Sequence, residues 1–404
     1  MSLSLLSFRP AIATTAGRRT QDSPCRANLN AASAVLELPK DVEVPKEVAA
    51  IFQKLQNGSD IRGIAIAGVD GEEQNITPTV AFFIGVGFAS WLSETLKMPA
   101  NSLHISIGRD SRLSGPLLLA SMVAGLASQG VSVAQFGLAT TPAMFMSCII
   151  PGYEYDGGII ITASHLPFNR NGFKFFTKEG GLEKGDIKVI LQQAAAAAHT
   201  AGMAPHARHS DDALVLDAAL NTDPSSAQHV DFMPVYAEHL RNIIKQGVDR
   251  KDNLEKPLEG FKVAVDPGNG SQFLEPDGWF PNHVPNPEDK TAMAAGVQAV
   301  QQSNSDLGVV LDTDVDRSAV VARDGQPINS NRYIALMSLI TLRLGLVCPA
   351  GVSGGTTIVT DSVHSNGLSD FIKAQAAHYR WKRGYKNVIG KGIELNKAGT
   401  DTPS

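Results

Sequence analysis

Three carboxylates at alternate positions are the clearest sign of chemistry in this chain. Asp312, Asp314 and Asp316 follow Leu307–Leu311, an apolar stretch that we expect to be a strand, and Arg317 comes next. Oxygen ligands gathered at one strand end suit a hard cation such as Mg²⁺. The EF-hand calcium loop is excluded because it needs glycine at position six and glutamate at position twelve, and both positions hold arginine here. A solvated acidic turn is the other alternative, but the three carboxylates would then repel one another.

A serine occupies a second predicted strand end. Ser164 follows the apolar stretch Gly158–Thr162 and precedes a turn that contains proline. We expect its hydroxyl to be exposed and to act as a nucleophile or as a carrier of a phosphoryl group. The chain lacks the flanking glycines of the G-x-S-x-G motif here, which argues against an α/β-hydrolase. A turn serine with only a local hydrogen bond is the alternative. His165 and Lys174 are candidate acid–base or charge-balancing groups.

Two further loops carry arginines. Gly108–Gly115 contains Arg109 and Arg112 and joins a predicted strand to a predicted helix N-terminus, where anions bind well. Guanidinium groups suit phosphate, although pairing with local acids is the alternative. Arg62 lies in a second such loop, Asp60–Gly63, which we interpret as a turn at glycine.

Strand-like and helix-like segments alternate along most of the chain, which predicts an α/β protein with parallel sheets. In such sheets ligands bind beyond the carboxyl ends of strands, where Ser164 and the three aspartates are expected. Residues 199–229 are polar and indicate a linker or surface excursion. The predicted strands are Leu103–Ile107, Val131–Phe136, Gly158–Thr162, Phe261–Asp266, Leu307–Leu311 and Thr356–Thr360, and the predicted helices are Pro116–Gln129, Glu183–Ala198, Asp231–Gln246, Thr291–Gln302 and Asn331–Leu344.

Length and composition set broad limits. The chain has 404 residues, enough for two or three domains, with 43% hydrophobic and 19% charged residues, as in ordinary globular proteins. The net charge of −5 gives no electrostatic reason to expect nucleic acid as a partner. We expect no membrane span, because no uninterrupted apolar stretch reaches about 18 residues. Three widely spaced cysteines predict neither a disulfide framework nor a structural zinc site, and they favour a reducing compartment.

The first thirty residues differ in composition from the rest. Met1–Asn30 contains four arginines, one acidic residue and seven serines or threonines. This composition is typical of an organellar transit peptide, and the segment lacks the apolar core of a secretory signal. We therefore expect residues 1–30 to be a disordered transit peptide, and a tail without a targeting role is the alternative.

Together these motifs resemble the α-D-phosphohexomutase superfamily, which includes phosphoglucomutases and phosphomannomutases. The resemblance covers roughly residues 50–397 and is most specific in the phosphoserine loop and the metal loop. It implies tandem α/β/α domains with mixed sheets, of which the full family pattern has three similar units and a smaller fourth. The matching segments are TASHLPFNRNGFKFF (162–176), DTDVDR (312–317), GRDSR (108–112), DIRG (60–63) and DPGNG (266–270).

The resemblance also implies roles for individual residues. Ser164 would carry the phosphoryl group, and its phosphoserine oxygen would join Asp312, Asp314 and Asp316 in holding Mg²⁺. The phosphoserine would phosphorylate a hexose phosphate, and a hexose 1,6-bisphosphate would serve as intermediate and activator. Glucose phosphate is the expected substrate in a plastid-type enzyme of the chloroplast stroma, and mannose phosphate stays open. The remaining implied site residues are Arg62, His165 and Lys174 as catalytic groups, and Arg109, Arg317, Arg383 and Tyr385 as phosphate- or substrate-binding groups.

The chain departs from the family pattern in three places. Leu166 replaces the usual asparagine, a change that leaves the nucleophile in place. A helix and a strand of the second domain are missing near residue 270, because too few residues remain for a crossover. The sugar-recognition loop and the fourth domain are not found. The expected domains are therefore 50–229 for domain I, 230–345 for domain II and 350–404 for a partial domain III.

Two other functions stay open at this point. A haloacid-dehalogenase-type phosphatase would use Asp312 as its nucleophile and leave Ser164 without a role. A catalytically inactive family member that binds a metal or a partner chain would fit the apparent lesions. The sequence is silent on oligomeric state.

Overall fold

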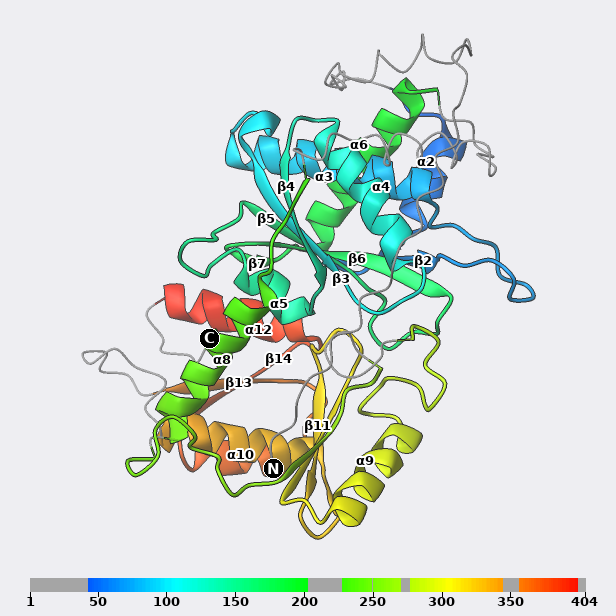
Figure 1. The fold of residues 1–404 in the computed structure, drawn as a ribbon. Helices are drawn as coiled ribbons and strands as arrows, with labels where there is room; N and C mark the ends of the chain where they lie inside the picture. The colour runs from blue at the N-terminus through cyan, green and yellow to red at the C-terminus, as the bar shows by residue number, and fades with distance from the viewer. Residues whose placement is uncertain (1–42, 203–226, 249, 270–276, 344–355, 399–404) are drawn as a thin grey trace. The chain divides into compact units, whose positions relative to one another are not determined.

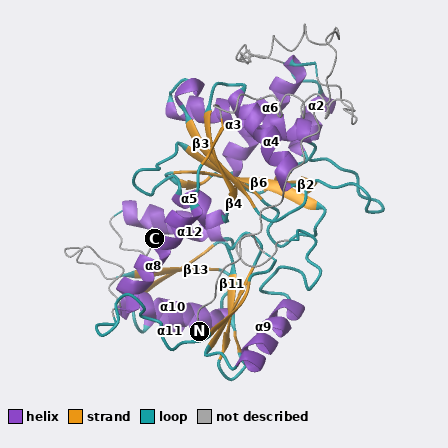
Figure 2. Cartoon of the chain, viewed as in Figure 1, coloured by secondary structure: helices purple, strands orange, loops and turns teal. Residues whose placement is uncertain are grey.

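A computed structural model of the chain describes residues 43–202, 227–248, 250–269, 277–343 and 356–398. Within these ranges the strands form an eight-stranded sheet, a four-stranded sheet and a two-stranded sheet (Figure 1). Helices alternate with the strands, so the predicted α/β class with mixed sheets is confirmed (Figure 2). The predicted transit segment, residues 1–30, lies outside the described residues.

The eight-stranded sheet contains the predicted phosphoserine loop. Its order is β1-β2-β6-β5-β3-β4-β8, and β7 pairs with β6. Strands β5, β3, β4 and β8 are parallel neighbours, whereas β6 runs antiparallel to both β2 and β5. The strands are β1 Gln56–Asn57, β2 Asp60–Ile64, β3 His104–Arg109, β4 Ser132–Leu138, β5 Gly157–Ile161, β6 Arg170–Thr177, β7 Gly180–Gly181 and β8 Ala227–His229.

Helices cover both faces of this sheet. One core is formed with α2 (Lys46–Gln53), α3 (Pro78–Leu96), α4 (Gly115–Ala127) and α6 (Lys184–Thr200), and a 3₁₀ turn spans Ala100–Ser102. The second core contains side chains of α5 (Thr141–Met146) and α8 (Met233–Val248). Strand β5 is buried throughout, since Ile159 and Ile161 face the first core and Ile160 faces the second. This double burial explains its uninterrupted apolar sequence.

Helix α3, which the sequence analysis did not predict, is the central helix of the first core. By length and composition alone it could cross a membrane, but 67% of its apolar window is buried inside the protein, as in a core helix. Glycines let the neighbouring helices approach α3 closely. A Cβ atom added at Gly125 of α4 would lie 2.1 Å from the carbonyl oxygen of Phe82 in α3. A Cβ atom added at Gly87 of α3 would lie 2.4 Å from the carbonyl oxygen of Ile190 in α6.

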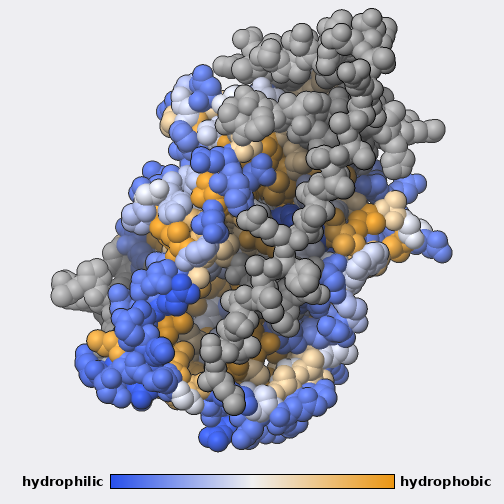
Figure 3. All heavy atoms as spheres, in the orientation of Figure 1, coloured by the Kyte–Doolittle hydropathy of each residue, from blue (hydrophilic) through white to orange (hydrophobic). Residues whose placement is uncertain are grey.

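The four-stranded sheet has the order β12-β11-β10-β9. Strands β9 (Val263–Asp266) and β10 (Leu307–Leu311) pair in parallel, with α9 (Lys290–Ser303) between them in the chain, and β11 (Ser318–Ala322) and β12 (Pro327–Ile328) follow antiparallel. Val263 and Val265 of the edge strand β9 are exposed by 44% and 43%. Apolar residues reach the surface elsewhere too, as the orange patches in Figure 3 show.

The remaining described elements form a small unit around the two-stranded sheet. Strands β13 (Thr357–Asp361) and β14 (Ala377–Trp381) pair in parallel, with α11 (Asn366–Lys373) between them in the chain. Helix α11 packs against α10 (Ser330–Arg343), and α12 (Tyr385–Lys397) packs against β13 and β14.

The structure corrects two local interpretations. Asp60–Gly63 is part of strand β2 and not a turn, because it pairs with β6 through the register Arg62 to Gly172. Residues 199–229 are not only a linker: α6 extends to Thr200, and Ala227–His229 adds the edge strand β8 to the sheet, while 203–226 lie outside the described residues.

We predict that Gly125→Ala destabilises the chain by about 1–3 kcal/mol, although alanine favours helix by about 1 kcal/mol. The added methyl group would collide with the backbone of α3. Chemical denaturation measures the change. Gly247→Ala in α8 is the matched control, since a Cβ there meets no atom within 4 Å. Equal free energies of unfolding for the two variants would contradict the tight α3–α4 contact.

Candidate active site

The site forms where strand ends of the two larger sheets meet. Because β3, β4 and β5 are parallel, the loops after them leave the same edge of the eight-stranded sheet. Ser164 lies in the loop after β5, and Asp312 directly follows β10 of the four-stranded sheet. The Ser164 hydroxyl donates a hydrogen bond to Asp312 Oδ2 at 2.7 Å. The predicted phosphoacceptor and the predicted metal loop are therefore in direct contact.

The backbone holds Ser164 in an unusual conformation. Its φ of 51° lies in the left-handed region, which non-glycine residues rarely occupy. The Ser164 amide donates to Thr162 Oγ1 at 2.8 Å, which stabilises this turn. The residue is only 4% exposed, so the expectation of an exposed hydroxyl was wrong. The hydroxyl is buried because the loop after β10 covers it.

The three aspartates fit a hard divalent cation. One oxygen from each lies within 4.8 Å of the others. Asp312 Oδ1 accepts from the amides of Asp316 and Arg317 at 3.1 and 3.0 Å, which fixes its carboxylate. Asp314 Oδ2 accepts from Thr141 Oγ1 at 2.6 Å, whereas its buried Oδ1 has no hydrogen-bond partner among the described residues. A buried carboxylate oxygen without a partner is a good candidate for a metal ligand.

Lysine and burial set the charge of this cluster. Burial, and then the neighbouring Asp314 and Asp316, raise the pKa of Asp312 to about 8. Burial would also raise the pKa of Asp314, but Lys174 outweighs it and holds that pKa well below its usual range. Lys174 Nζ lies 2.7 Å from Asp314 Oδ2 and 2.5 Å from Asp316 Oδ2. Although burial opposes it, these two carboxylates raise the pKa of Lys174, so the ammonium group stays charged.

Arg317 connects the serine, the aspartates and a histidine. Its Nη2 donates to Ser164 Oγ at 2.9 Å and to Asp312 Oδ2 at 3.0 Å, and it lies 2.6 Å from His165 Nδ1. Because an arginine only donates, His165 Nδ1 is the acceptor in this pair. Burial, followed by Arg317 and Arg62, lowers the pKa of His165, so its imidazole is neutral.

The structure places the other predicted basic residues, Arg62, Arg109 and Arg383, in different surroundings. Arg62 donates to the Thr162 carbonyl at 2.6 Å and pairs with Asp60, so it supports the strand that precedes the serine loop. Arg109 donates to the Asp110 carbonyl at 3.0 Å. Within the described part of the chain, the exposed Arg383 makes no hydrogen bond or ion pair with the serine loop or the aspartate loop, and the side chain of Tyr385 lies outside that part.

Three residues near the serine were not predicted as site residues. Thr141 holds Asp314, and Asn286 accepts from Arg317 Nη1 at 3.3 Å; the local sequence gives no signal for either. Arg112 is fully buried, and its Nη2 donates to the Ser164 carbonyl at 2.6 Å. The GRDSR segment indicated this arginine in the sequence, but only Arg109 of that segment was predicted to bind phosphate or substrate.

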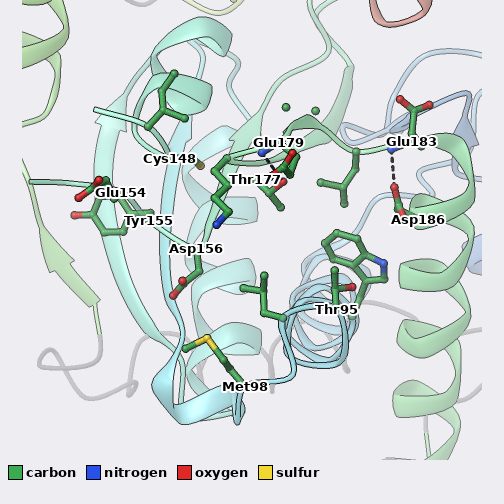
Figure 4. A pocket seen from close by; sticks show the side chains of 17 residues that line it. Thr95, Met98, Cys148, Glu154, Tyr155, Asp156, Thr177, Glu179, Glu183 and Asp186 are labelled. Atoms are coloured by element: carbon green, nitrogen blue, oxygen red, sulfur yellow. Dashed lines mark hydrogen bonds between the residues drawn. The ribbon is translucent and has the colours of Figure 1, made fainter. Parts of the chain in front are cut away.

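A separate pocket of about 820 Å³ lies away from these residues (Figure 4). Apolar side chains such as Trp91 and Met98 and carboxylates such as Asp156 and Glu179 line it. None of the predicted site residues does. The chemistry described above therefore depends on contacts between loops and not on this pocket.

Comparisons with known proteins identify the family of this chain. Family models described as phosphoglucomutase/phosphomannomutase, alpha/beta/alpha domain I and domain II match residues 53–200 and 271–325. A phosphoglucomutase of Neisseria gonorrhoeae is 27% identical over 310 residues, which cover 72% of this chain and 58% of that protein. A phosphomannomutase/phosphoglucomutase of Pseudomonas syringae is 27% identical over 376 residues, covering 88% and 68%.

A solved structure shares the fold. The phosphoglucomutase/phosphomannomutase family protein of Burkholderia thailandensis superposes with a TM-score of 0.62 at 23% identity, covering 86% of this chain and 69% of that one. The chain thus spans between 58% and 69% of the length of these relatives.

We predict that Lys174→Met destabilises the metal-free chain by about 3–5 kcal/mol, because Asp314 is left as a buried and unpaired charge. Mg²⁺ at 100 times its dissociation constant should restore up to about 2.7 kcal/mol. Urea denaturation in EDTA and in Mg²⁺ measures both values.

Lys245→Met is the control for this prediction. Its partner Glu255 is 84% exposed, so the loss should be at most about 1 kcal/mol with or without Mg²⁺. A free energy of unfolding of the Lys174 variant that is the same in EDTA and in Mg²⁺ would contradict cation binding by the aspartates.

Proposed function

The chain belongs to the α-D-phosphohexomutase superfamily, and from this premise we propose that it moves phosphoryl groups on hexose phosphates through a phosphoserine at Ser164. One observation carries the proposal. The Ser164 hydroxyl touches both Asp312 of the carboxylate cluster and the guanidinium of Arg317. A hydroxyl between a cation-binding cluster and a fixed positive charge is placed for phosphoryl transfer, which depends mainly on positioning and charge neutralisation.

The proposed loading step uses a hexose 1,6-bisphosphate. Ser164 Oγ attacks one phosphorus, the Oγ–P bond forms, and the bond from phosphorus to the sugar oxygen breaks. The serine proton, donated to Asp312 Oδ2 in the structure, ends on the departing sugar oxygen. The reverse step passes the phosphoryl group to the free hydroxyl of a hexose monophosphate and forms a bisphosphate again. When Ser164 then takes the other phosphoryl group of that bisphosphate, the remaining phosphate is at a different position on the sugar.

Several charged residues around Ser164 would stabilise the negative charge of the transferred phosphoryl group. Arg317 already donates to the serine oxygen and is placed to bind the phosphoryl oxygens. Lys174 keeps Asp314 ionised and also pairs with Asp316, and Arg62 supports the strand before the serine. A Mg²⁺ held by Asp312, Asp314, Asp316 and a phosphoserine oxygen would supply further positive charge for the transferred group.

The substrate class rests on the relatives. Their names specify phosphoglucomutase and phosphomannomutase activity, so we infer a hexose phosphate and leave glucose or mannose open. The chain covers only part of those relatives, so phosphoserine formation and full turnover are separate questions. An inactive member that still binds metal would bind Mg²⁺ without turnover.

We predict that incubation with glucose 1,6-bisphosphate and Mg²⁺ adds one phosphoryl group to Ser164. Peptide mass spectrometry locates the group, and Ser164→Ala should abolish the modification while its Mg²⁺ affinity stays within about threefold, since the aspartates remain. EDTA should slow the loading step strongly, because the site then loses positive charge.

Other results would favour the alternatives. A phosphoryl group that hydroxylamine removes would lie on an aspartate such as Asp312 and would indicate a phosphatase of the haloacid-dehalogenase type. Tight Mg²⁺ binding by a folded chain that takes no phosphate would indicate the inactive member, and the mutase proposal would then be abandoned.

We also propose that the chain is directed to plastids by its arginine- and serine-rich N-terminal segment. Residues 1–42 fused to a fluorescent reporter should bring it into isolated chloroplasts and be shortened on import. A matched fusion in which Arg9, Arg18, Arg19 and Arg26 are replaced by glutamate should stay outside. Equal import of the two fusions would overturn the assignment.

A further inference from the structure

We propose that Arg112 is the positioning residue that sets the conformation of the phosphoacceptor loop. This inference rests on the proposed function for its effect on rate, but its structural part stands on contacts alone. Arg112 lies 52 residues before Ser164 and reaches it through a backbone carbonyl, so it acts through the loop and does not touch the reacting oxygen.

Arg112 holds the loop by its backbone carbonyls. Its Nη2 donates to the carbonyls of Ser164 and Leu166 at 2.6 and 2.7 Å. Its Nη1 donates to those of Pro167 and Arg170 at 2.6 and 3.0 Å. A planar guanidinium can serve four carbonyls at once, whereas a lysine ammonium has three donors on one atom. The guanidinium therefore fixes both ends of the turn that follows Ser164.

A buried acid connects the same guanidinium to the amide of the serine. Arg112 Nε donates to Asp110 Oδ2 at 3.2 Å, and the Thr162 hydroxyl donates to the same oxygen at 2.6 Å. Thr162 Oγ1 in turn accepts from the Ser164 amide at 2.8 Å. The chain of contacts thus holds Ser164 from its amide side and from its carbonyl side. This arrangement accounts for the left-handed φ of 51° at a residue with a side chain.

The turn at residues 277–280 closes over this arginine. The ring of Phe280 lies 4.9 Å from the guanidinium carbon of Arg112, in a cation–π contact. Gly278, with φ of 71°, packs so closely that a Cβ would lie 2.6 Å from the carbonyl oxygen of Ser111. The ring of Trp279 lies 4.9 Å from that of Phe168 in the serine loop, with the two planes tilted by 40°. The guanidinium is therefore sealed from water, which strengthens its hydrogen bonds.

Two measurements on the full chain test the proposal. Hydrogen–deuterium exchange of residues 162–170 reports the loop, where the amides of Ser164, Leu166 and Arg170 are hydrogen-bonded. Single-turnover phosphorylation of Ser164 by glucose 1,6-bisphosphate gives a maximal rate and a half-saturation concentration. The variants are Arg112→Lys, which keeps the charge beside Asp110, and Thr162→Val, which removes the other end of the network. Arg241→Lys, in an exposed ion pair on α8, is the control.

We expect Arg112→Lys to speed exchange of the loop at least tenfold while β3 and α4 keep their protection. The maximal rate should fall roughly 100-fold with little change in half-saturation, as for a misplaced reacting group. Thr162→Val should give the same pattern with a smaller loss, and it keeps the test valid if Arg112→Lys does not fold.

Three results would decide against the proposal or separate it from the proposed function. Unchanged loop exchange in both variants would overturn it. Faster exchange throughout the eight-stranded sheet would also overturn it, because the arginine would then be a general stability element. Faster loop exchange in a chain whose wild type takes no phosphate would support the positioning role and reject the phosphoryl-transfer proposal.

Discussion

The crowding of three carboxylates at the end of β10 is the constraint on which the rest of the site depends. Asp312 and Asp314 are buried, and both can be ionised only if positive charge lies beside them. Lys174 and Arg317 supply two fixed charges, and their placement leaves Asp314 Oδ1 without a hydrogen-bond partner among the residues that the structure describes. The cluster is thus stable enough to form and still open to a cation. The Ser164 hydroxyl donates a hydrogen bond to Asp312 of this cluster. Its oxygen therefore lies beside carboxylates whose negative charge is offset by Lys174 and Arg317.

Sheet topology explains how distant segments meet at this point. Strand β6 lies antiparallel between β2 and β5, which places Lys174 opposite Ile160 and Arg62 opposite Gly172. The parallel strands β3, β4 and β5 bring the arginine loop, the Thr141 helix start and the serine loop to one edge. Hydrophobic cores on both faces of the sheet hold these strands in place. The loops therefore start from rigid strand ends, as the precise placement of site residues requires.

The proposed phosphorylation of the serine and the expected binding of the sugar involve different parts of the chain. Ser164 and the aspartates lie in the segments 53–200 and 271–325 that the family models match. Arg383 lies outside both segments and is exposed. The edge strand β9, with its two exposed valines, also shows that the four-stranded sheet is less completely covered than the eight-stranded one. The proposed phosphoserine site could therefore be tested separately from full turnover.

Local sequence patterns predicted the α/β class, the strands β3, β4, β5 and β10, and the serine and aspartate loops, because apolar stretches that end in polar residues give a local signal. They did not reveal helix α3, strand β6 as a partner of β2, or the roles of Thr141, Asn286 and Arg112. Those depend on which strands pair and which loops touch, and no local pattern encodes a contact across 173 residues such as that from Thr141 to Asp314. The burial of Ser164 was likewise decided by tertiary structure, since the loop that covers its hydroxyl lies about 150 residues further along the chain.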